Sequence, residues 1–235
     1  MTQPVNVAEY VELAAAKVDP EVWCYFEGGA GDEVTLRGNT AAYGRWELRP
    51  RVLVDVGEVS AATTVLGTPV SMPLCVAPVA MQRLLDPEGE IATARATAAA
   101  GTLMCVSTIT TSSHAEIATA GAAPRWLQLY VLADKQRTLD HIAEAREAGY
   151  SAVVLTVDLP YVGRRERDLR LGFENPPSGL ALPYATLFET TPALTWRDLE
   201  WIRSECGLPL DEAPRLLAYG GERKMAALAQ ERLAA

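Results

Sequence analysis

Long apolar runs are absent from this 235-residue sequence, and positive charge is scarce. No run approaches the roughly 18 apolar residues that a membrane-spanning helix needs, and the N-terminus lacks the basic start and apolar core of a secretory signal peptide. Lysine and arginine number 21 against 30 acidic residues, which gives a net charge of −9. Because phosphate binding needs a basic surface, this charge argues against nucleic acid. We therefore expect no membrane span, no nucleic-acid partner and a cytoplasmic location.

The four cysteines form no C-x-x-C motif, which argues against a zinc or redox site, and we expect no metal. Cys75 and Cys105 lie inside apolar runs and are expected to be reduced core residues. The hydrophobic share of 49% and the charged share of 22% are ordinary for a globular protein. A chain of this length buries roughly 70–75% of its unfolded surface, so it can form a substantial core.

The first 73 residues predict a lead-in of helices and extended segments. A helix over residues 7–17 is followed by a second helix with Asp19 as its N-cap, Pro20 at its first position and Gly28 as its C-cap. The remaining predicted segments are a helix over residues 32–42 and extended chain over residues 46–54 and 63–65.

From residue 74 the sequence alternates between short apolar runs and helical patterns, which is typical of a parallel α/β fold. The predicted strands are residues 74–80, 103–107, 125–131 and 151–157. The predicted helices are residues 88–100, 113–121 and 135–148, of which the second opens with the capping box Ser113-x-x-Glu116.

This alternation stops after residue 168. Residues 169–192 are rich in Pro, Gly and Leu and predict a long loop, a feature that is usually functional in a compact domain. A helix is predicted over residues 196–204. Residues 208–210 resemble the start of a fifth strand that does not continue, and residues 211–235 predict one polar helix.

Small and polar residues mark the C-terminal ends of the predicted strands, where parallel α/β folds collect their chemistry. Gln128 offers a donor and an acceptor to a heteroaromatic edge, and Arg165 can bind a carboxylate through two parallel hydrogen bonds. Taken singly, each polar residue is more often a satisfied structural group, and the arginines near residue 165 can equally form a solvated face. Their recurrence at four strand ends indicates a ligand-binding α/β protein. The candidates are Val79, Ala80, Ser107, Gln128, Tyr130, Thr156 and Arg165.

Five ordered motifs resemble the FMN-dependent 2-hydroxy-acid oxidases and dehydrogenases, which include glycolate oxidase, lactate oxidase, L-lactate dehydrogenase and mandelate dehydrogenase. The resemblance covers roughly residues 7–210 and implies a TIM (β/α)8 barrel. The motifs are YFEGGAGDEVTLRGN (25–39), APVAMQRLLDPEGEIATARATAAAGT (77–102), VSTITTSS (106–113), QLYV (128–131) and TVDLPYVGRRERD (156–168).

The resemblance implies FMN as cofactor and a small (S)-2-hydroxy acid as substrate, which is oxidised to the 2-keto acid. Tyr25 and Arg165 match residues that bind the substrate carboxylate, and Tyr130 matches a catalytic tyrosine bonded to the substrate's hydroxyl or keto oxygen. The residues matching the cofactor contacts are Val79 and Ala80, whose backbone faces the reactive side of the flavin, and Ser107, Gln128 and Thr156 at its polar edge. The loop at residues 169–192 corresponds to the family's mobile loop.

The resemblance ends before the family's other catalytic motifs. These are a lysine on the fifth strand, the histidine base and second arginine of an SNHGGR-like motif, and the phosphate-binding loops after strands seven and eight. We therefore divide the chain into a lead-in (1–73), the first half of a β/α barrel (74–210) and an unmatched tail (211–235). The alternatives are a truncated, non-catalytic half barrel that acts as a structural or self-associating module, and an unrelated ligand-binding α/β domain. A homo-oligomer is a possible partner.

The chain contains two histidines, and neither matches the family's base. His114 falls in the capping box and His141 on the polar part of the third βα helix. We expect both to be surface residues.

Overall fold

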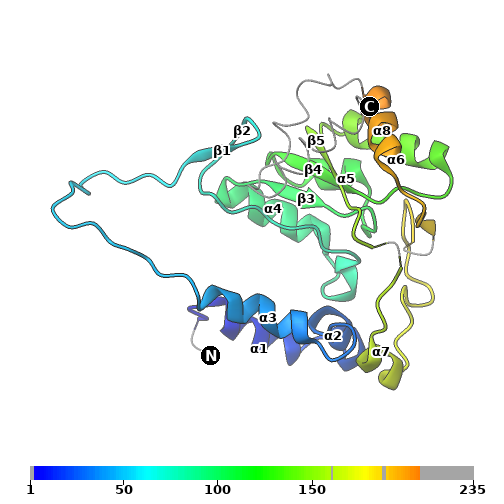
Figure 1. Ribbon diagram of the computed structural model, residues 1–235, viewed down its shortest axis with the longest axis horizontal. Helices are drawn as coiled ribbons and strands as arrows, with labels where there is room; N and C mark the ends of the chain where they lie inside the picture. The colour runs from blue at the N-terminus through cyan, green and yellow to red at the C-terminus, as the bar shows by residue number, and fades with distance from the viewer. Residues whose placement is uncertain (1–2, 160, 187–188, 207–235) are drawn as a thin grey trace. The chain divides into compact units, whose positions relative to one another are not determined.

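The computed structural model describes residues 3–159, 161–186 and 189–206 (Figure 1). The chain divides into two compact units. The first comprises Met1–Val59, Arg83–Pro87 and Tyr161–Ala181, and the second comprises Ser60–Gln82, Glu88–Pro160 and Leu182–Ala235.

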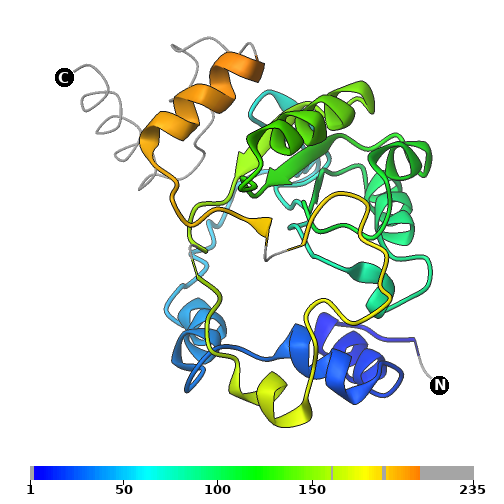
Figure 2. The same cartoon turned by 90° about the vertical axis from the view of Figure 1, so that its right-hand side faces the viewer.

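Helices make up the first unit. They are α1 (Val7–Ala15), α2 (Pro20–Glu27), α3 (Val34–Tyr43) and α7 (Glu166–Leu171). The Asp19 side chain accepts a hydrogen bond from Glu21 N at 2.9 Å, and Gly28 ends α2, so the predicted caps are confirmed. Helix α7 packs against α2, as Figure 2 shows. This helix was not predicted, because it is short and runs into the Pro- and Gly-rich loop.

A three-stranded parallel sheet is the centre of the second unit, with the order β3–β4–β5. The strands are β3 (Met104–Val106), β4 (Arg125–Leu129) and β5 (Ala152–Leu155). The connecting helices are α5 (His114–Thr119) and α6 (Lys135–Glu147), while α4 (Glu90–Ala100) precedes β3 and α8 (Trp196–Cys206) follows the long loop. This alternation confirms the parallel α/β prediction, and the Ser113–Glu116 capping box is present as predicted.

The core of the second unit lies between the sheet and its helices. Leu127 and Leu129 of β4 are fully buried, as is Ile117 of α5, and they join one cluster with Met104 of β3 and Ile142 of α6. Because β4 is covered on both faces, its residues from Trp126 to Leu129 are all buried instead of alternating between buried and exposed.

The prediction of a strand over residues 74–80 is wrong. Only Val76 pairs, as a single parallel bridge to Met104. Val76 N donates to Leu103 O, and Cys105 N donates to Val76 O. The next donor in that ladder would be residue 78, which is proline and has no N–H, so the ladder stops after one residue.

Three further short elements lie near this segment in the sequence. β1 (Thr63–Val65) was predicted as extended chain and pairs antiparallel with β2 (Thr68–Val70). Leu66 and Gly67 at their turn have φ of 47° and 77°, as a type I′ hairpin turn requires. A 3₁₀ helix, η1, covers Gln82–Leu84.

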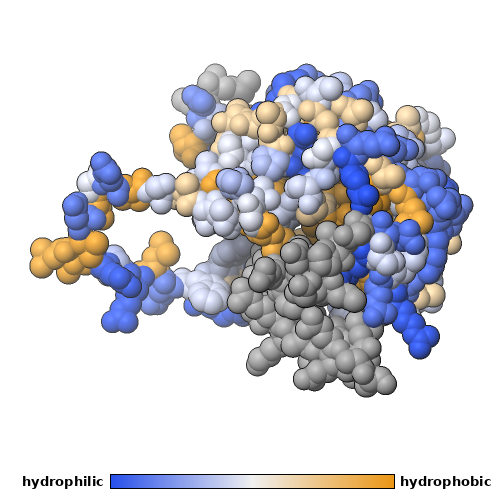
Figure 3. Space-filling model, turned by 90° about the horizontal axis from the view of Figure 1, so that it is seen from above, coloured by the Kyte–Doolittle hydropathy of each residue, from blue (hydrophilic) through white to orange (hydrophobic). Residues whose placement is uncertain are grey.

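The segment at residues 46–59 forms neither helix nor strand and exposes many apolar side chains. Leu48 and Leu53 are fully exposed, and Trp46 and Val52 are 82% and 83% exposed. Orange atoms mark this loop in Figure 3, at the place where Figure 1 shows it extending to the left.

The histidines are not surface residues, so that prediction is wrong. His114 and His141 are 1% and 2% exposed, and their rings stack on each other and on Tyr184. The long loop supplies Tyr184 and thereby covers faces of α5 and α6 that the sequence pattern marks as polar. Cys105 is buried as predicted, but Cys75 is exposed, because the strand predicted around it does not form.

Within the described residues, no helix is long and apolar enough to cross a membrane. The predicted strand at residues 208–210 and the tail at 211–235 lie outside the described residues. The division of the chain at residues 73 and 210 stays a proposal.

Candidate active site

A chain of hydrogen bonds joins the ends of the three parallel strands. Gln128 Oε1 accepts from Ser107 Oγ at 3.3 Å, and Gln128 Nε2 donates to Thr156 Oγ1 at 2.8 Å. Gln128 is 3% exposed and Ser107 is 4% exposed. The structure therefore brings together the three residues predicted for the polar edge of a flavin, although that role itself stays a prediction.

Thr108 supports this chain and was missed in the sequence. Its Oγ1 donates to Gln128 O at 2.6 Å and accepts from Tyr130 N at 2.9 Å, while its own N–H donates to Gln128 Oε1 at 3.2 Å. Thr108 thus fixes the backbone between Gln128 and Tyr130. Nothing local marks it, because its partners lie at least 20 residues away along the chain.

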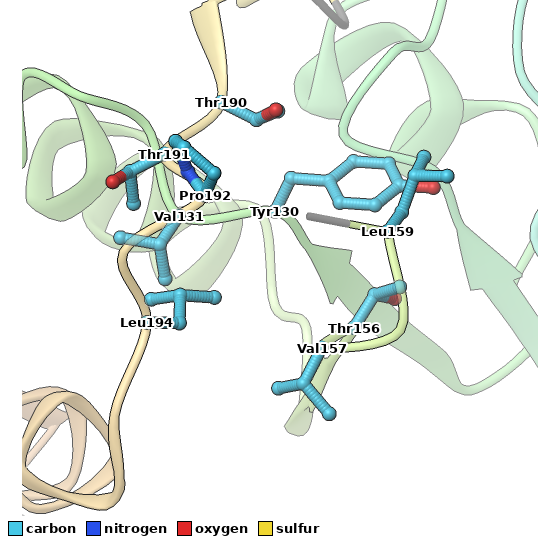
Figure 4. A pocket seen from close by; sticks show the side chains of 9 residues that line it. All are labelled: Tyr130, Val131, Thr156, Val157, Leu159, Thr190, Thr191, Pro192 and Leu194. Carbon is cyan, nitrogen blue, oxygen red and sulfur yellow. The ribbon is translucent and has the colours of Figure 1, made fainter. Parts of the chain in front are cut away.

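A pocket of about 190 Å³ opens beside Tyr130 and Thr156, at the C-terminal ends of β4 and β5 (Figure 4). Figure 4 shows the Tyr130 ring extending towards Leu159. The volume is below the range of about 300–1,000 Å³ for typical ligand sites, so it suits a small molecule. The lining residues are Tyr130, Val131, Thr156, Val157, Leu159, Thr190, Thr191, Pro192 and Leu194. Four of these come from the end of the long loop or just after it.

Val79 and Ala80 lie in a turn that is tightly held. Gln82 Nε2 donates to Val79 O at 3.3 Å, and Gln82 Oε1 accepts from Thr93 Oγ1 at 2.6 Å. Met81, which is 1% exposed, has a φ of 54°. A buried non-glycine residue in this left-handed region is strained, and such strain often marks a functional turn.

The carboxylate of Glu90 anchors the same turn and was also missed. Glu90 is 1% exposed and accepts from Gln82 N, from both Thr111 N and Thr111 Oγ1, and from Ser112 Oγ, at distances from 2.6 to 3.3 Å. Four donors compensate its burial. Glu90 thereby ties the turn before α4 to the loop that follows β3.

The first unit contains the two residues predicted to bind a carboxylate. Arg165 Nη2 donates to the Tyr25 carbonyl, and the guanidinium carbon lies 5.0 Å from the centre of the Tyr25 ring. The Tyr25 ring also stacks on Phe173, with the ring centres 5.0 Å apart. Burial raises the pKa of Tyr25 despite a hydrogen bond with Asn175, so its hydroxyl is protonated at neutral pH.

The predicted residues thus form two groups. Tyr25 and Arg165 contact each other in the first unit. Ser107, Gln128 and Thr156 form one chain in the second unit, and Thr156 and Tyr130 share a pocket there. Among the described residues, no group of three or more His, Cys, Asp or Glu side chains could hold a metal ion.

The family model for FMN-dependent dehydrogenases matches residues 14–211. The chain belongs to this family. An L-lactate oxidase of Nostoc sp. is 42% identical over 94% of this chain and 69% of its own length. Glycolate oxidase 3 of Arabidopsis thaliana is 40% identical, over 87% of this chain and 61% of its own length.

Solved structures of a mandelate oxidase are also similar. One has a TM-score of 0.81 and 37% identity, over 88% of this chain and 61% of that protein. The parallel strands and alternating helices described here are therefore part of a TIM barrel. The chain spans about 60–70% of the length of the relatives it matches.

The described residues fit the ring of the flavin that the family implies. A flavin's polar edge presents both donors and acceptors. Ser107, Gln128 and Thr156 provide hydroxyl and amide groups of both kinds, and hydrogen bonds join them to one another.

Proposed function

We propose that this protein binds FMN at the C-terminal ends of β3, β4 and β5 and oxidises a small (S)-2-hydroxy acid to the corresponding 2-keto acid. The observation that carries the proposal is the chain of hydrogen bonds from the buried Ser107 and Gln128 to the partly buried Thr156, which ends at the pocket beside Tyr130. Bound FMN would supply the acceptor for the substrate's α-hydrogen and its electron pair.

Ser107, Gln128 and Thr156 hold the polar edge of the ring in this proposal. The backbone of Val79 and Ala80 faces its reactive side. The contacts that Gln82 and Glu90 make to this turn keep that backbone from moving when the cofactor binds. A preorganised turn of this kind lowers the ordering cost of binding.

Tyr130 of the second unit, and Tyr25 and Arg165 of the first unit, keep in this proposal the substrate-binding roles that the family resemblance implies for each of them. Tyr130 lines the pocket and donates from its hydroxyl to the substrate's hydroxyl or keto oxygen. Tyr25 and Arg165 bind the carboxylate. Tyr25 can donate, because burial raises its pKa and keeps the hydroxyl protonated.

Neither histidine of the chain is the base that accepts the proton from the substrate hydroxyl. Both are buried among aromatic rings. Burial lowers the pKa of His114 to about 3 and that of His141 to about 4, so both are weak bases. The cytoplasmic location and the homo-oligomer stay predictions.

The visible absorption spectrum tests the proposal. The purified chain is mixed with FMN, excess flavin is removed, and L-lactate or glycolate is then added without oxygen. Retained flavin bands that the substrate bleaches are the expected result. Loss of all flavin would overturn the proposal. Retained flavin that neither substrate bleaches would leave a flavin-binding protein and overturn the oxidation of these two acids.

A further inference from the structure

One buried carboxylate of the first unit has no role in the proposal above. Asp168 lies in α7 and is 7% exposed. Its Oδ2 accepts a hydrogen bond from Arg165 Nε at 2.5 Å, and its Oδ1 accepts from Cys24 Sγ at 3.8 Å. Both carboxylate oxygens are therefore used within the unit, and one of them holds the arginine predicted to bind substrate.

The guanidinium of Arg165 is held on two edges. The Asp168 carboxylate accepts a hydrogen bond from Nε, and the Tyr25 carbonyl accepts one from Nη2. The guanidinium carbon also lies over the Tyr25 ring, 5.0 Å from its centre. Nη1 has no partner among the described residues, and the Arg165 side chain keeps 24% of its surface exposed. The group is therefore oriented by protein contacts while one nitrogen stays open for a ligand.

Gly28 ends α2 beside this arrangement. A Cβ at Gly28 would lie 2.6 Å from the Cys24 carbonyl and 3.5 Å from Arg165 Nη2. The first distance is shorter than any real contact, so the end of α2 requires glycine, whereas the second is an ordinary van der Waals distance.

We propose that Asp168 is a positioning residue, which fixes the guanidinium of Arg165 so that its open nitrogen meets the carboxylate of the substrate. This inference rests on the proposed function, because it assigns a supporting group to the same carboxylate site. Asp168 does not touch the substrate. Its effect passes through the Arg165 side chain, which is long and flexible when unsupported.

Positioning and simple electrostatics predict opposite results at this site. The negative charge of Asp168 repels an anionic ligand, so its removal alone would strengthen carboxylate binding. If Asp168 instead orients Arg165, its removal weakens binding, because a misplacement of about 1 Å can cost as much as 100-fold at a binding or reacting group. The sign of the change therefore separates the two roles.

The experiment uses the full chain with FMN added and compares Asp168→Asn with wild type by calorimetric titration. Oxalate is the carboxylate probe, and glycolamide is the neutral probe of similar size. We expect oxalate to bind Asp168→Asn about 10-fold or more weakly, and glycolamide to bind both proteins alike. A purely structural defect would weaken both probes.

Glu166→Gln is the matched control. Glu166 lies two residues away in the same helix, is an exposed carboxylate, and pairs only with the exposed arginines Arg164 and Arg170 in the described structure. The Glu166→Gln variant removes the same charge as Asp168→Asn but leaves the contacts of Arg165 unchanged. Its affinity for oxalate should therefore stay at or slightly above the wild-type value. If Asp168→Asn does not fold, Asp168→Glu provides the comparison, because it keeps the charge and displaces the carboxylate.

A second readout does not need a ligand. The Nε–H of Arg165 should give a resolved NMR signal with slow solvent exchange in wild type and in Glu166→Gln, and should lose that protection in Asp168→Asn. Oxalate binding that Asp168→Asn leaves unchanged or strengthens would overturn the inference and leave the proposed function standing. Failure of wild type to bind oxalate would overturn the substrate site of the proposed function and the inference together.

Discussion

The buried histidine pair should make folding stability depend strongly on pH between 7.5 and 5. His114 and His141 are almost fully buried, and none of their four ring nitrogens has a hydrogen-bond partner within the described structure. Burial lowers the pKa of His114 to about 3, with a contribution from the neighbouring His141, and lowers that of His141 to about 4. Both values lie below the ordinary 6.5 that the unfolded chain would show.

The sign and size of the effect follow from these values. Between pH 6.5 and about 4 the unfolded chain binds protons that the folded chain does not, so stability falls as pH falls. A pH of 5 lies about 1.5 units below the unfolded pKa of each histidine. Protonation of the unfolded chain therefore lowers the free energy of unfolding by about 2 kcal/mol for each histidine. The two together cost about 4 kcal/mol, a large part of the 5–15 kcal/mol that is typical of folded domains.

The carboxylates with lowered pKa values do not contribute to the pH dependence of stability between pH 7.5 and 5. Hydrogen bonds to Lys135 and Thr195 lower the pKa of Asp198 to about 2, and those of Glu33 and Glu189 are also lowered. A carboxylate with a lowered pKa loses its stabilising effect only as pH falls below the ordinary value near 4. The range from pH 7.5 to 5 therefore reports on the histidines.

Urea unfolding at pH 7.5, 6 and 5 measures the effect. The double variant His114→Phe/His141→Phe keeps two aromatic rings and leaves the chain without histidine, because the sequence contains only these two. We expect wild type to lose about 4 kcal/mol over this range and the double variant to lose less than about 1 kcal/mol. Equal pH dependence in the two proteins would refute the reasoning. Proton NMR of the two ring signals, which should not titrate above pH 5 in the folded state, checks the same point.

Three further predictions concern single side chains. Glu90→Gln should lower the free energy of unfolding in urea by about 1–3 kcal/mol, because Nε2 of glutamine cannot accept the hydrogen bonds from Thr111 and Ser112. Glu88 forms an exposed ion pair with Arg95, so the control Glu88→Gln should change that free energy by less than about 0.5 kcal/mol. Gln128→Leu should weaken retention of FMN about 10-fold, while Gln136→Leu on the exposed face of α6 leaves retention unchanged. Leu127→Ala should cost about 2–5 kcal/mol of unfolding free energy, because Leu127 is fully buried in the main core cluster.

Elements whose cause is local could be predicted from the sequence. The Ser113–Glu116 capping box and the Asp19 cap both form within a few residues, and both are present in the structure. The apolar run at β4 was identified because it is buried on both faces. The prediction of a strand at residues 74–80 was wrong because it considered apolar side chains and not backbone N–H donors. Pro78 lacks the N–H that the next hydrogen bond of the parallel ladder needs.

The prediction that the histidines are surface residues was wrong for a different reason, because no local signal marks them as buried. His141 lies on a helix with a polar face, and its ring is covered by His114 of α5 and by Tyr184, which lies more than 40 residues later. A pattern of apolar residues along one helix cannot register a partner that arrives from a distant loop.

The same distinction separates the site residues that were found from those that were missed. Ser107, Gln128 and Thr156 were identified because each stands at the end of its own strand, and parallel strands bring such ends together. Thr108 and Glu90 act through contacts with partners from another element, so neighbouring residues do not reveal them. Asp168 pairs with Arg165 three residues earlier, whereas its contact with Cys24 of α2 is evident only in the structure. Topology thus brings the strand-end residues together, whereas the groups that hold those residues in place depend largely on the packing of side chains far apart in the chain. For that reason the supporting residues are where the structure adds most to the family resemblance, and where substitutions should separate binding of a ligand from stability of the fold.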